Sequence, residues 1–282
     1  GGEAVINADV LTRHVARFNA MEPEGVVNLV PNAAAEAWLR GRIPLFECPN
    51  AEVEEIYYFR WWALRKQLRQ VGDEIAFTEF ITKPRPISSA LGHNLMEGRW
   101  LHDQNYLDEY VRYWFHDEPA RTQLHKFSQW EAEALYQRYL VTGDKKFLTA
   151  QLTDLVRDYG QWEHERLTTN GLFWQFDVRD AMEESISGSR TNKNLRPTIN
   201  SYMFGNAQAI ARIAKLAGNQ RVATEYETKA SHLRQLVQDT LWDSNAGFFE
   251  VVHDNGAFAN AREEIGFIPW YFELPAADKK YA

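Results

Sequence analysis

The feature that most constrains the fold is a run of long amphipathic helices joined in pairs. Apolar residues recur at intervals of three and four in each of four segments, at 121–141, 145–165, 198–217 and 221–241. That spacing puts them on one helix face, so each segment has to bury a stripe against another helix. Short glycine-containing turns at Gly143 and Gly218 follow the first and third segments, as is typical of antiparallel neighbours. The sequence therefore predicts an all-α chain of helical hairpins.

The long loops decide between the two architectures that helical hairpins can build. An α-solenoid repeats short connections, whereas here loops of roughly fifteen residues occur at 72–87, 166–180 and 242–260. These loops carry aromatic, acidic and histidine side chains, which suits a ring of hairpins whose loops gather around a central cleft. We therefore expect residues 51–282 to form the first part of an (α/α)6 toroid. Residues 1–50 are expected to be a lead-in segment, either a linker or the remnant of a preceding domain.

Shorter elements are expected around these hairpins. Helical spacing of apolar residues predicts a helix that starts at Ala51 and ends near Gly72. Two short helices are expected at 87–100 and 105–115, and the strand signals are sparse, the clearest being 247–252.

The charge of the chain restricts its partners. Its 282 residues include 31 basic and 39 acidic ones, giving a formal net charge of −8. Without a basic stripe to neutralise phosphates, nucleic acid and anionic membrane surfaces are poor partners. No apolar run reaches the ~18 residues of a membrane span.

Cys48 is the sole cysteine, which excludes an internal disulfide and a cysteine-based metal site. A neutral or cationic small ligand fits this composition, and no cofactor or metal is expected.

One segment, Gly171–Arg190, concentrates side chains that suit carbohydrate chemistry. Four carboxylates occur there within eight residues, beside several aromatic rings: Asp177, Asp180, Glu183 and Glu184. Ring faces pack against the apolar face of a sugar, and a carboxylic acid can protonate a glycosidic oxygen. We interpret Trp174 with Asp177 as a sugar-contacting pair. The alternative for the carboxylates is a solvated acidic cluster favoured by a helix N-terminus.

Several ordered motifs resemble those of six-hairpin glycosidases. They are Gly143-Asp144 followed by Gly171-Leu172-Phe173-Trp174, the stretch from Arg196 to Gly218, and the stretch from Leu241 to Glu250. Over roughly residues 52–275 the chain is similar to glycoside hydrolase family 63, mannosylglycerate hydrolases and trehalases. The resemblance implies an (α/α)6 catalytic domain that performs exo-hydrolysis with inversion at the anomeric carbon.

The resemblance also implies roles for individual residues. The general-acid segment of the family matches Ala181-Met182-Glu183-Glu184-Ser185, which places Glu183 at the acid position. This sequence has Glu where the family has Asp, and extra residues precede Arg190, so Glu184 and Asp180 remain alternatives. Two other stretches look like substrate-facing parts of the fold and supply the remaining binding candidates: Arg60, Trp61, His93, Asn94 and Glu97.

Each of these binding candidates has a structural alternative. Arg60 suits sugar hydroxyls or a uronate, but it could equally stack among aromatic rings and pair with Glu54 or Glu55. The histidine, asparagine and glutamate of the second stretch could instead form a satisfied polar cluster at a helix start.

Together these features predict an exo-acting, inverting glycoside hydrolase that acts in the periplasm or outside the cell. Its expected substrate is an oligosaccharide or polysaccharide side chain with a terminal α-glucosyl, α-mannosyl or arabinofuranosyl unit. Inversion requires a carboxylic acid and a carboxylate about 6.5–9.5 Å apart. Two alternatives are a non-catalytic carbohydrate-binding toroid and a sugar epimerase of the α/α-toroid type. The epimerase would depend on histidines such as His93, His102 and His125.

The helix count predicts that the ring continues beyond this chain. A six-hairpin ring needs twelve helices, and about eight are counted before Ala282. In the families that the chain resembles, the general base is a Glu in a loop beyond the segment matching Ile265 to Leu274. The stretch from Pro275 to Ala282 contains no Glu. We therefore expect the remainder of the catalytic domain, including the base, C-terminal to Ala282.

Overall fold

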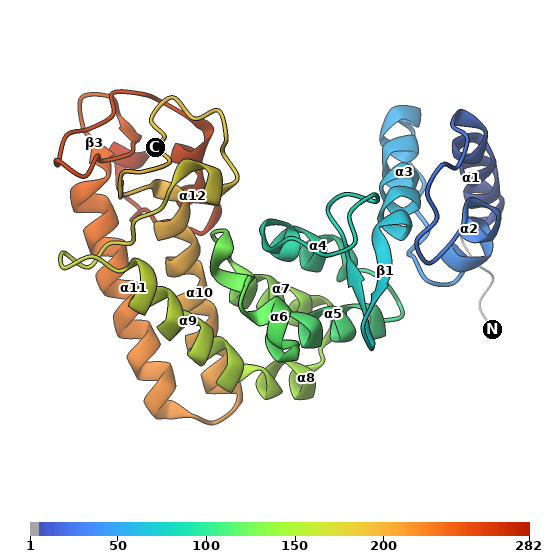
Figure 1. Cartoon of the computed structure of the whole chain (residues 1–282), viewed down its shortest axis with the longest axis horizontal. Coiled ribbons are helices and arrows are strands. Elements are labelled where there is room, and N and C mark those ends of the chain that lie inside the picture. The colour runs from blue at the N-terminus through green and yellow to red at the C-terminus, as the bar shows by residue number, and fades with distance from the viewer. Residues whose placement is uncertain (1–5) are drawn as a thin grey trace. The chain divides into compact units, whose positions relative to one another are not determined.

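A computed structural model describes residues 6–282, and the chain forms two compact units. The first unit holds the described residues up to Ala90 together with Glu97–Arg121, and the second holds Leu91–Met96 and Thr122–Ala282. Both are mostly helical (Figure 1). None of the helices within residues 6–282 is long and apolar enough to cross a membrane.

The first unit is a helical assembly with one β-hairpin. Its elements are α1 (Asp9–Met21), α2 (Asn32–Leu39), α3 (Ala51–Gln67), β1 (Leu68–Val71), β2 (Glu74–Phe77), η1 (Ser88–Ala90), α5 (Asn105–His116) and α6 (Glu118–Arg121). α1 and α2 pack against α3, and α5 packs against β2. Asn50 caps α3 by accepting hydrogen bonds from the backbone N–H groups of Glu52 and Val53. The lead-in segment of residues 1–50 thus carries, in its described part, two helices that share a core with α3.

The helix expected over residues 51–72 ends early, at Gln67. Leu68–Val71 instead pairs antiparallel with Glu74–Phe77, with Leu68 opposite Phe77. Gly72 turns the chain between the strands at φ 61°, a left-handed conformation that glycine adopts without steric cost. The prediction was wrong here because apolar spacing over a few residues does not distinguish a helix end from a buried strand.

The second unit is organised around one buried helix, α10. Its elements are residues 91–96 of α4 (Leu91–Gly98), η2 (Leu124–Lys126), α7 (Glu131–Thr142), α8 (Lys145–Ala150), α9 (Leu152–Arg166), η3 (Asp177–Asp180), α10 (Pro197–Leu216), α11 (Gln220–Thr240), β3 (Trp242–Asp243), β4 (Phe248–Phe249), η4 (Glu264–Phe267), α12 (Ile268–Tyr271) and η5 (Lys279–Tyr281). Most side chains of α10 are buried, and the helix packs against α7, α9, α11 and α12. In Figure 1 α10 and α11 run side by side, as the hairpin prediction requires.

Local sequence explains the ends of these helices. Proline at position 197 begins α10, where its missing N–H costs no hydrogen bond. Gly218, at φ 74°, ends the hairpin's first helix, and the Asn219 side chain accepts a hydrogen bond from Val222 N–H to start α11. Gly143 and Asp144 do the same between α7 and α8. The turns predicted from these glycines are confirmed.

Two helix predictions in this unit need correction. The helix expected from residue 121 begins only at Glu131, because residues 127–130 are not helical and Ser128 N–H among them bonds to Arg179 C=O at 2.8 Å. The helix expected over residues 145–165 is interrupted at Gln151, which separates α8 from α9. The strand expected over residues 247–252 is reduced to β4, which pairs antiparallel with β3. The all-α prediction is nevertheless confirmed for the described residues.

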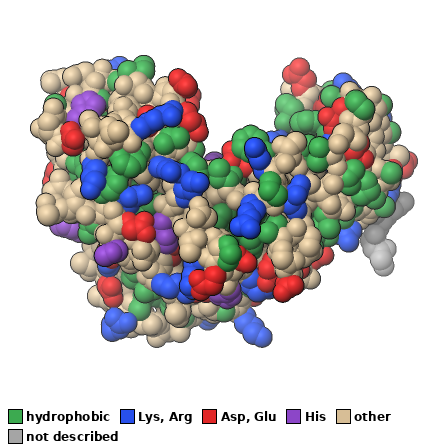
Figure 2. Space-filling model, in the orientation of Figure 1, with side chains coloured by type: hydrophobic (Ala, Val, Ile, Leu, Met, Phe, Trp, Pro, Cys, Tyr) green, Lys and Arg blue, Asp and Glu red, His purple; other side chains and the backbone are tan. Residues whose placement is uncertain are grey.

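The surface carries charges of both signs. On the face drawn in Figure 2, acidic and basic side chains are interspersed among hydrophobic ones. This mixture agrees with the modest excess of acidic residues in the sequence.

Candidate active site

The acidic segment predicted to carry the chemistry connects α9 to α10 within the second unit. Its start is fixed by Asn200 of α10, which accepts a hydrogen bond from Phe173 N–H and donates one to Phe173 C=O, both at 2.8 Å. Trp174 N–H donates to Arg166 C=O at 3.1 Å. Because Asn200 lies on the buried helix, the segment is held against the core before its carboxylates begin.

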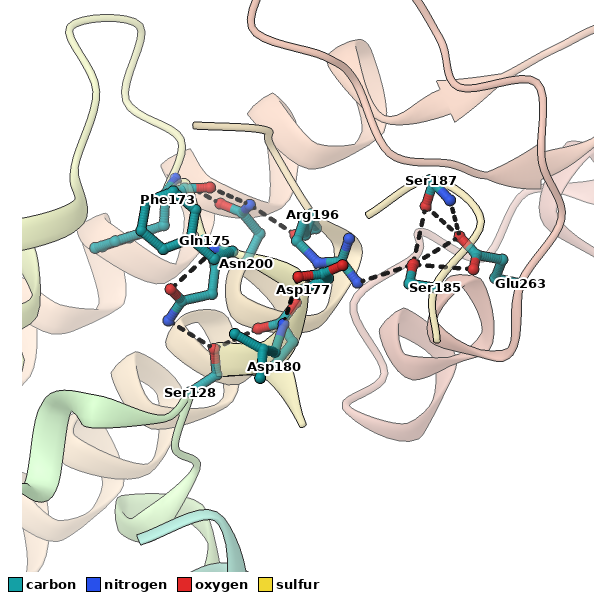
Figure 3. Close-up of polar contacts among 12 residues, drawn as sticks. Ser128, Phe173, Gln175, Asp177, Asp180, Ser185, Ser187, Arg196, Asn200 and Glu263 are labelled. Atoms are coloured by element: carbon teal, nitrogen blue, oxygen red, sulfur yellow. Dashed lines mark hydrogen bonds and ion pairs between the residues drawn. The ribbon is translucent and has the colours of Figure 1, made fainter. Parts of the chain in front are cut away.

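A buried ion pair anchors the middle of the segment. Arg196 Nε lies 2.6 Å from Asp180 Oδ2, and both side chains are completely shielded from solvent. Ser128 Oγ donates to the other carboxylate oxygen, Oδ1, and Gln175 Nε2 donates to the serine at 3.2 Å (Figure 3). Asp180 is therefore fully engaged by the protein and has no open oxygen for a substrate.

Burial and hydrogen bonding act on Asp180 in opposite directions. Loss of solvent raises the pKa of this carboxyl above its ordinary value. The guanidinium of Arg196 and the hydroxyls of Ser128 and Thr198 offset part of that rise by favouring the charged form. The geometry, with a cation on one oxygen and a hydroxyl donor on the other, is that of an ionised, structural carboxylate.

Glu263 anchors the end of the segment from a different loop. Its Oε1 accepts from Ser185 Oγ at 2.9 Å and Ile186 N–H at 2.8 Å, and its Oε2 accepts from Ser187 N–H at 3.2 Å and from the Ser187 hydroxyl. We call this arrangement the Glu263 clasp (Figure 3). Burial alone would raise the pKa of Glu263, but the combined donors outweigh it and hold the pKa below its usual range.

Between these two anchors lie the predicted acids. Glu183 and Glu184 are both exposed, and Arg190 Nη2 is 3.4 Å from the Glu183 carbonyl oxygen. Ala181 connects them to Asp180 in a left-handed conformation at φ 60°, which strains a residue with a Cβ. The two glutamates are thus presented to solvent on a short stretch whose two ends are fixed.

Asp177 and Trp174, predicted to contact a sugar together, are both buried. Asp177 Oδ1 accepts from Val178 N–H at 2.7 Å, and its carboxylate packs so closely on Gly188 that a Cβ there would come within 2.3 Å of Oδ2. The Trp174 ring lies 4.4 Å from the Arg166 guanidinium and 4.8 Å from the Lys193 ammonium. These contacts cover the indole, so in this structure Trp174 is not an open stacking platform.

In the first unit, three of the predicted binding residues lie close together. Arg60 Nε and Nη2 bond the two carboxylate oxygens of Glu97 at 2.9 and 3.0 Å, a bidentate pair. The expected alternative partners, Glu54 and Glu55, instead bind His14 and Arg17. Burial raises the pKa of Glu97, and Arg60 opposes that rise. Trp61, the next residue on α3, is buried and contacts Tyr57 edge-on.

His93 and Asn94 belong to the second unit. The His93 ring meets Trp130 edge-to-face at 5.5 Å, and burial lowers the histidine pKa, so the neutral imidazole is favoured. Asn94 is buried. Trp130 immediately precedes α7, so His93 lies at the N-terminal end of that helix. Ser128, which hydrogen-bonds to Asp180, lies just before the same end.

The structure adds a buried acidic cluster whose two carboxylates the sequence did not single out, although it named His125 as a candidate of the epimerase alternative. His125 Nε2 lies 2.5 Å from Asp158 Oδ1, and Glu131 adjoins the same aspartate. Burial is the main cause that raises the pKa of Asp158 to about 6 and the pKa of Glu131 well above its ordinary value. The cluster joins α7, α9 and η2, and it takes no part in the Asp180 network.

The residues that the sequence reading missed share one property: each acts through a distant partner. Arg196 begins the motif from Arg196 to Gly218, which the sequence comparison with six-hairpin glycosidases already included. Nothing in the neighbouring sequence identifies Asp180 as its ion-pair partner. No sequence motif around Ser128 or Glu263 indicates that they hydrogen-bond to the acidic segment. Within residues 6–282 no group of three His, Cys, Asp or Glu side chains is placed to hold a metal ion.

Comparison with known proteins identifies the family. The model of the mannosylglycerate hydrolase MGH1-like glycoside hydrolase domain matches residues 83–282. A solved structure of a sialidase superimposes on 98% of the chain with a TM-score of 0.94 and 42% sequence identity. The chain spans only 26% of that protein.

Two weaker similarities complete the comparison. A family 78 rhamnosidase of Bacillus sp. GL1 superimposes on 69% of the chain, covering 22% of its own length, with a TM-score of 0.53 and 11% identity. This likeness concerns the fold alone. An uncharacterised protein of Borreliella burgdorferi is 26% identical over 148 residues, 52% of this chain and 31% of its own. The expected six-hairpin, (α/α)6-type glycosidase fold is confirmed.

Proposed function

This chain belongs to the mannosylglycerate hydrolase MGH1-like glycoside hydrolase family, and on that basis we propose that it supplies the general acid of an inverting, exo-acting hydrolase. The proposed substrate is an oligosaccharide or polysaccharide side chain ending in an α-glucosyl, α-mannosyl or arabinofuranosyl unit. The proposed acid is Glu183. In this reaction it protonates the glycosidic oxygen while a carboxylate elsewhere activates a water on the opposite face of the sugar.

The observation that carries this proposal is the double anchoring of the acidic segment. Asp180 is fixed by Arg196 on one side of Glu183, and Ser185 is fixed by Glu263 on the other. Both anchoring carboxylates have their oxygens occupied, which leaves the exposed glutamates as the carboxyl groups of this stretch that a substrate can reach. Catalysis gains from holding an acid in place before the substrate arrives.

The name of the sialidase relative suggests an acidic sugar as a second substrate class. An accessible guanidinium is the group best suited to bind a sugar carboxylate through two hydrogen bonds. Arg196, the arginine at the centre of the segment's contacts, is completely buried and already paired. The net charge of −8 disfavours an anionic ligand, so we favour a neutral terminal sugar. Because Arg190 of the segment is exposed, the test includes a sialoside.

The experiment assays protein that carries both the acid and the base on a panel of aryl α-glucoside, α-mannoside, α-L-arabinofuranoside and α-sialoside substrates, with the anomer of the first product read by proton NMR. We expect hydrolysis of one neutral glycoside with inverted configuration. Glu183→Gln should lower kcat at least ~10²-fold on a substrate with a poor leaving group, and much less with an activated one. Glu184→Gln is the matched control and should retain most activity.

Three results would refute parts of this proposal. Equal losses on both leaving groups would move the acid role from Glu183 to another carboxyl. Binding of sugars without any hydrolysis would favour the non-catalytic alternative. Epimerised monosaccharide without glycoside cleavage would favour the epimerase.

A further inference from the structure

A cavity of about 540 Å³ opens in the second unit, apart from the residues of the acidic segment. Its walls come from four places along the chain. They are the turn Thr168–Asn170 after α9, the strand-like stretch at Lys193 and Leu195, the end of α11 at Asp239 and Thr240, and the loop from Val252 to Phe258. Its volume lies within the range of small-molecule binding sites, roughly 300–1,000 Å³.

The floor of the cavity is firmly built. Leu195 N–H donates to Val252 C=O at 2.8 Å, and Val252 N–H donates to Leu195 C=O at 3.0 Å. The loop beyond is closed by His253 N–H, which donates to Ala257 C=O at 2.9 Å, and by Gly256 at φ 86°. Both floor side chains are buried and apolar. The cavity is therefore shaped by paired backbone rather than by loosely arranged side chains.

The lining has the two properties that a sugar ring requires. Phe258 is half-buried in the wall, and within the described residues its ring has no aromatic or cationic partner. Asp254 is exposed at the rim, and its carboxylate has no hydrogen-bond partner within residues 6–282. A free ring face can stack on the apolar face of a sugar, and a free carboxylate accepts hydrogen bonds from its hydroxyls.

The cavity lies at the same end of the helices as the acidic segment. Helices α9 and α11 end at the cavity, whereas α10, which packs against both, begins at Pro197, directly after Arg196 of the segment's ion pair. Because neighbouring helices are antiparallel, the ends of α9 and α11 and the start of α10 share one face of the unit. Leu195 in the cavity floor also pairs with Trp174 at the start of the segment. A long glycan on that face would meet both places.

We propose that this cavity is an accessory binding site for a neutral sugar unit of an oligosaccharide or polysaccharide, distinct from the acidic segment. Phe258 supplies the stacking surface, and Asp254 accepts hydrogen bonds from sugar hydroxyls. Two acidic residues line the cavity against one lysine, which disfavours an anionic sugar. The carbohydrate class follows from the family, but the site does not depend on Glu183 or on hydrolysis.

Affinity gel electrophoresis of the purified full chain tests this directly, with glycogen, yeast mannan or sugar-beet arabinan cast in the gel. We expect one polymer to retard the protein. Phe258→Ala should weaken the apparent affinity at least ~10-fold through loss of stacking area, and Asp254→Ala should weaken it several-fold. Phe80→Ala, which changes an exposed Phe of the first unit, is the control and should migrate as the parent does.

The outcomes separate this site from the proposed function. Glu183→Gln should be retarded like the parent even when it has lost activity. In protein that carries both the acid and the base, the cavity variants should still cleave an aryl glycoside. Phe258→Leu keeps apolar volume without the flat ring, so its loss of retardation with an unchanged melting temperature supports stacking. Parent protein that no polymer retards, or two cavity variants that bind as well as the parent, would overturn the proposal.

Discussion

Arg196 and Asp180 form an ion pair in which neither side chain reaches solvent, with Nε 2.6 Å from Oδ2. The arginine immediately precedes α10 and the aspartate ends η3, so the pair ties the acidic segment to the central helix. A buried pair of this kind contributes little net stability compared with apolar side chains, yet removing one partner is costly. Its conspicuous effect is to fix where the following glutamates lie.

Asp180→Asn should therefore destabilise the protein by about 3–5 kcal/mol, because Arg196 would remain charged, buried and unpaired. Urea unfolding measures this loss. Glu55→Gln is the matched control, since it breaks the partly exposed pair of Glu55 with Arg17 and should cost less than about 1 kcal/mol. A stable but inactive Asp180→Asn would instead make Asp180 the catalytic acid.

Glu263→Gln should loosen the end of the acidic segment. The amide keeps one accepting oxygen but loses the other, so at least the donors from Ser187 lose their partner, at about 1–3 kcal/mol. We expect faster tryptic cleavage after the exposed Arg190 and a lower kcat with little change in KM. Glu264→Gln, which alters the exposed neighbour, should leave the cleavage rate unchanged. If both variants are cut at the parent's rate, the Glu263 clasp does not order the segment.

The buried cluster predicts a stability that depends on pH. In the folded protein the pKa of Asp158 is raised from 3.8 to about 6, mainly by burial, so the folded state binds more protons than the unfolded state between these values. The contribution of Asp158 to stability is therefore greatest below the unfolded pKa and falls as pH rises through the folded pKa. The parent's unfolding free energy relative to Asp158→Asn should fall by on the order of 2–3 kcal/mol from pH 4 to pH 7.

Thermal unfolding of both proteins across that pH range checks the prediction. Glu131 and His125 titrate within the same cluster, so the double variant Glu131→Gln, Asp158→Asn should flatten the profile further. A difference between parent and Asp158→Asn that stays constant with pH would contradict a raised pKa at Asp158.

Gly205→Ala should reveal how closely α10 packs on the chain after α12. A Cβ at Gly205 would lie 2.3 Å from Phe272 Cδ1, and that ring is buried, so we expect a loss of about 1–3 kcal/mol. Gly160→Ala is the matched control on α9, where a Cβ meets no atom within 4 Å. It should stabilise the protein by up to about 1 kcal/mol through helix propensity. Equal denaturation midpoints for the two variants would show that Phe272 moves aside freely.

The sequence by itself determined the hairpin of α10 and α11 and the turns at Gly143 and Gly218. Two local properties predict this hairpin: the spacing of apolar residues along α10 and α11, and the glycine at position 218. Both depend only on residues close together in the sequence. The position of the acidic segment between α9 and α10 was equally accessible. Its composition identified four carboxylates to consider, and two of them, Glu183 and Glu184, are exposed.

Only the tertiary structure decided which carboxylates are occupied by the protein. Asp180 and Glu183 look alike in sequence, but one is neutralised by Arg196 and the other is exposed. The sequence shows Trp174 only as an aromatic residue in a loop. In the folded chain Arg166 and Lys193 lie against its ring. The helix expected from residue 121 fails for a related reason, because Ser128 bonds to a loop far along the chain. Burial and pairing are set by residues distant in sequence, and no local pattern encodes them.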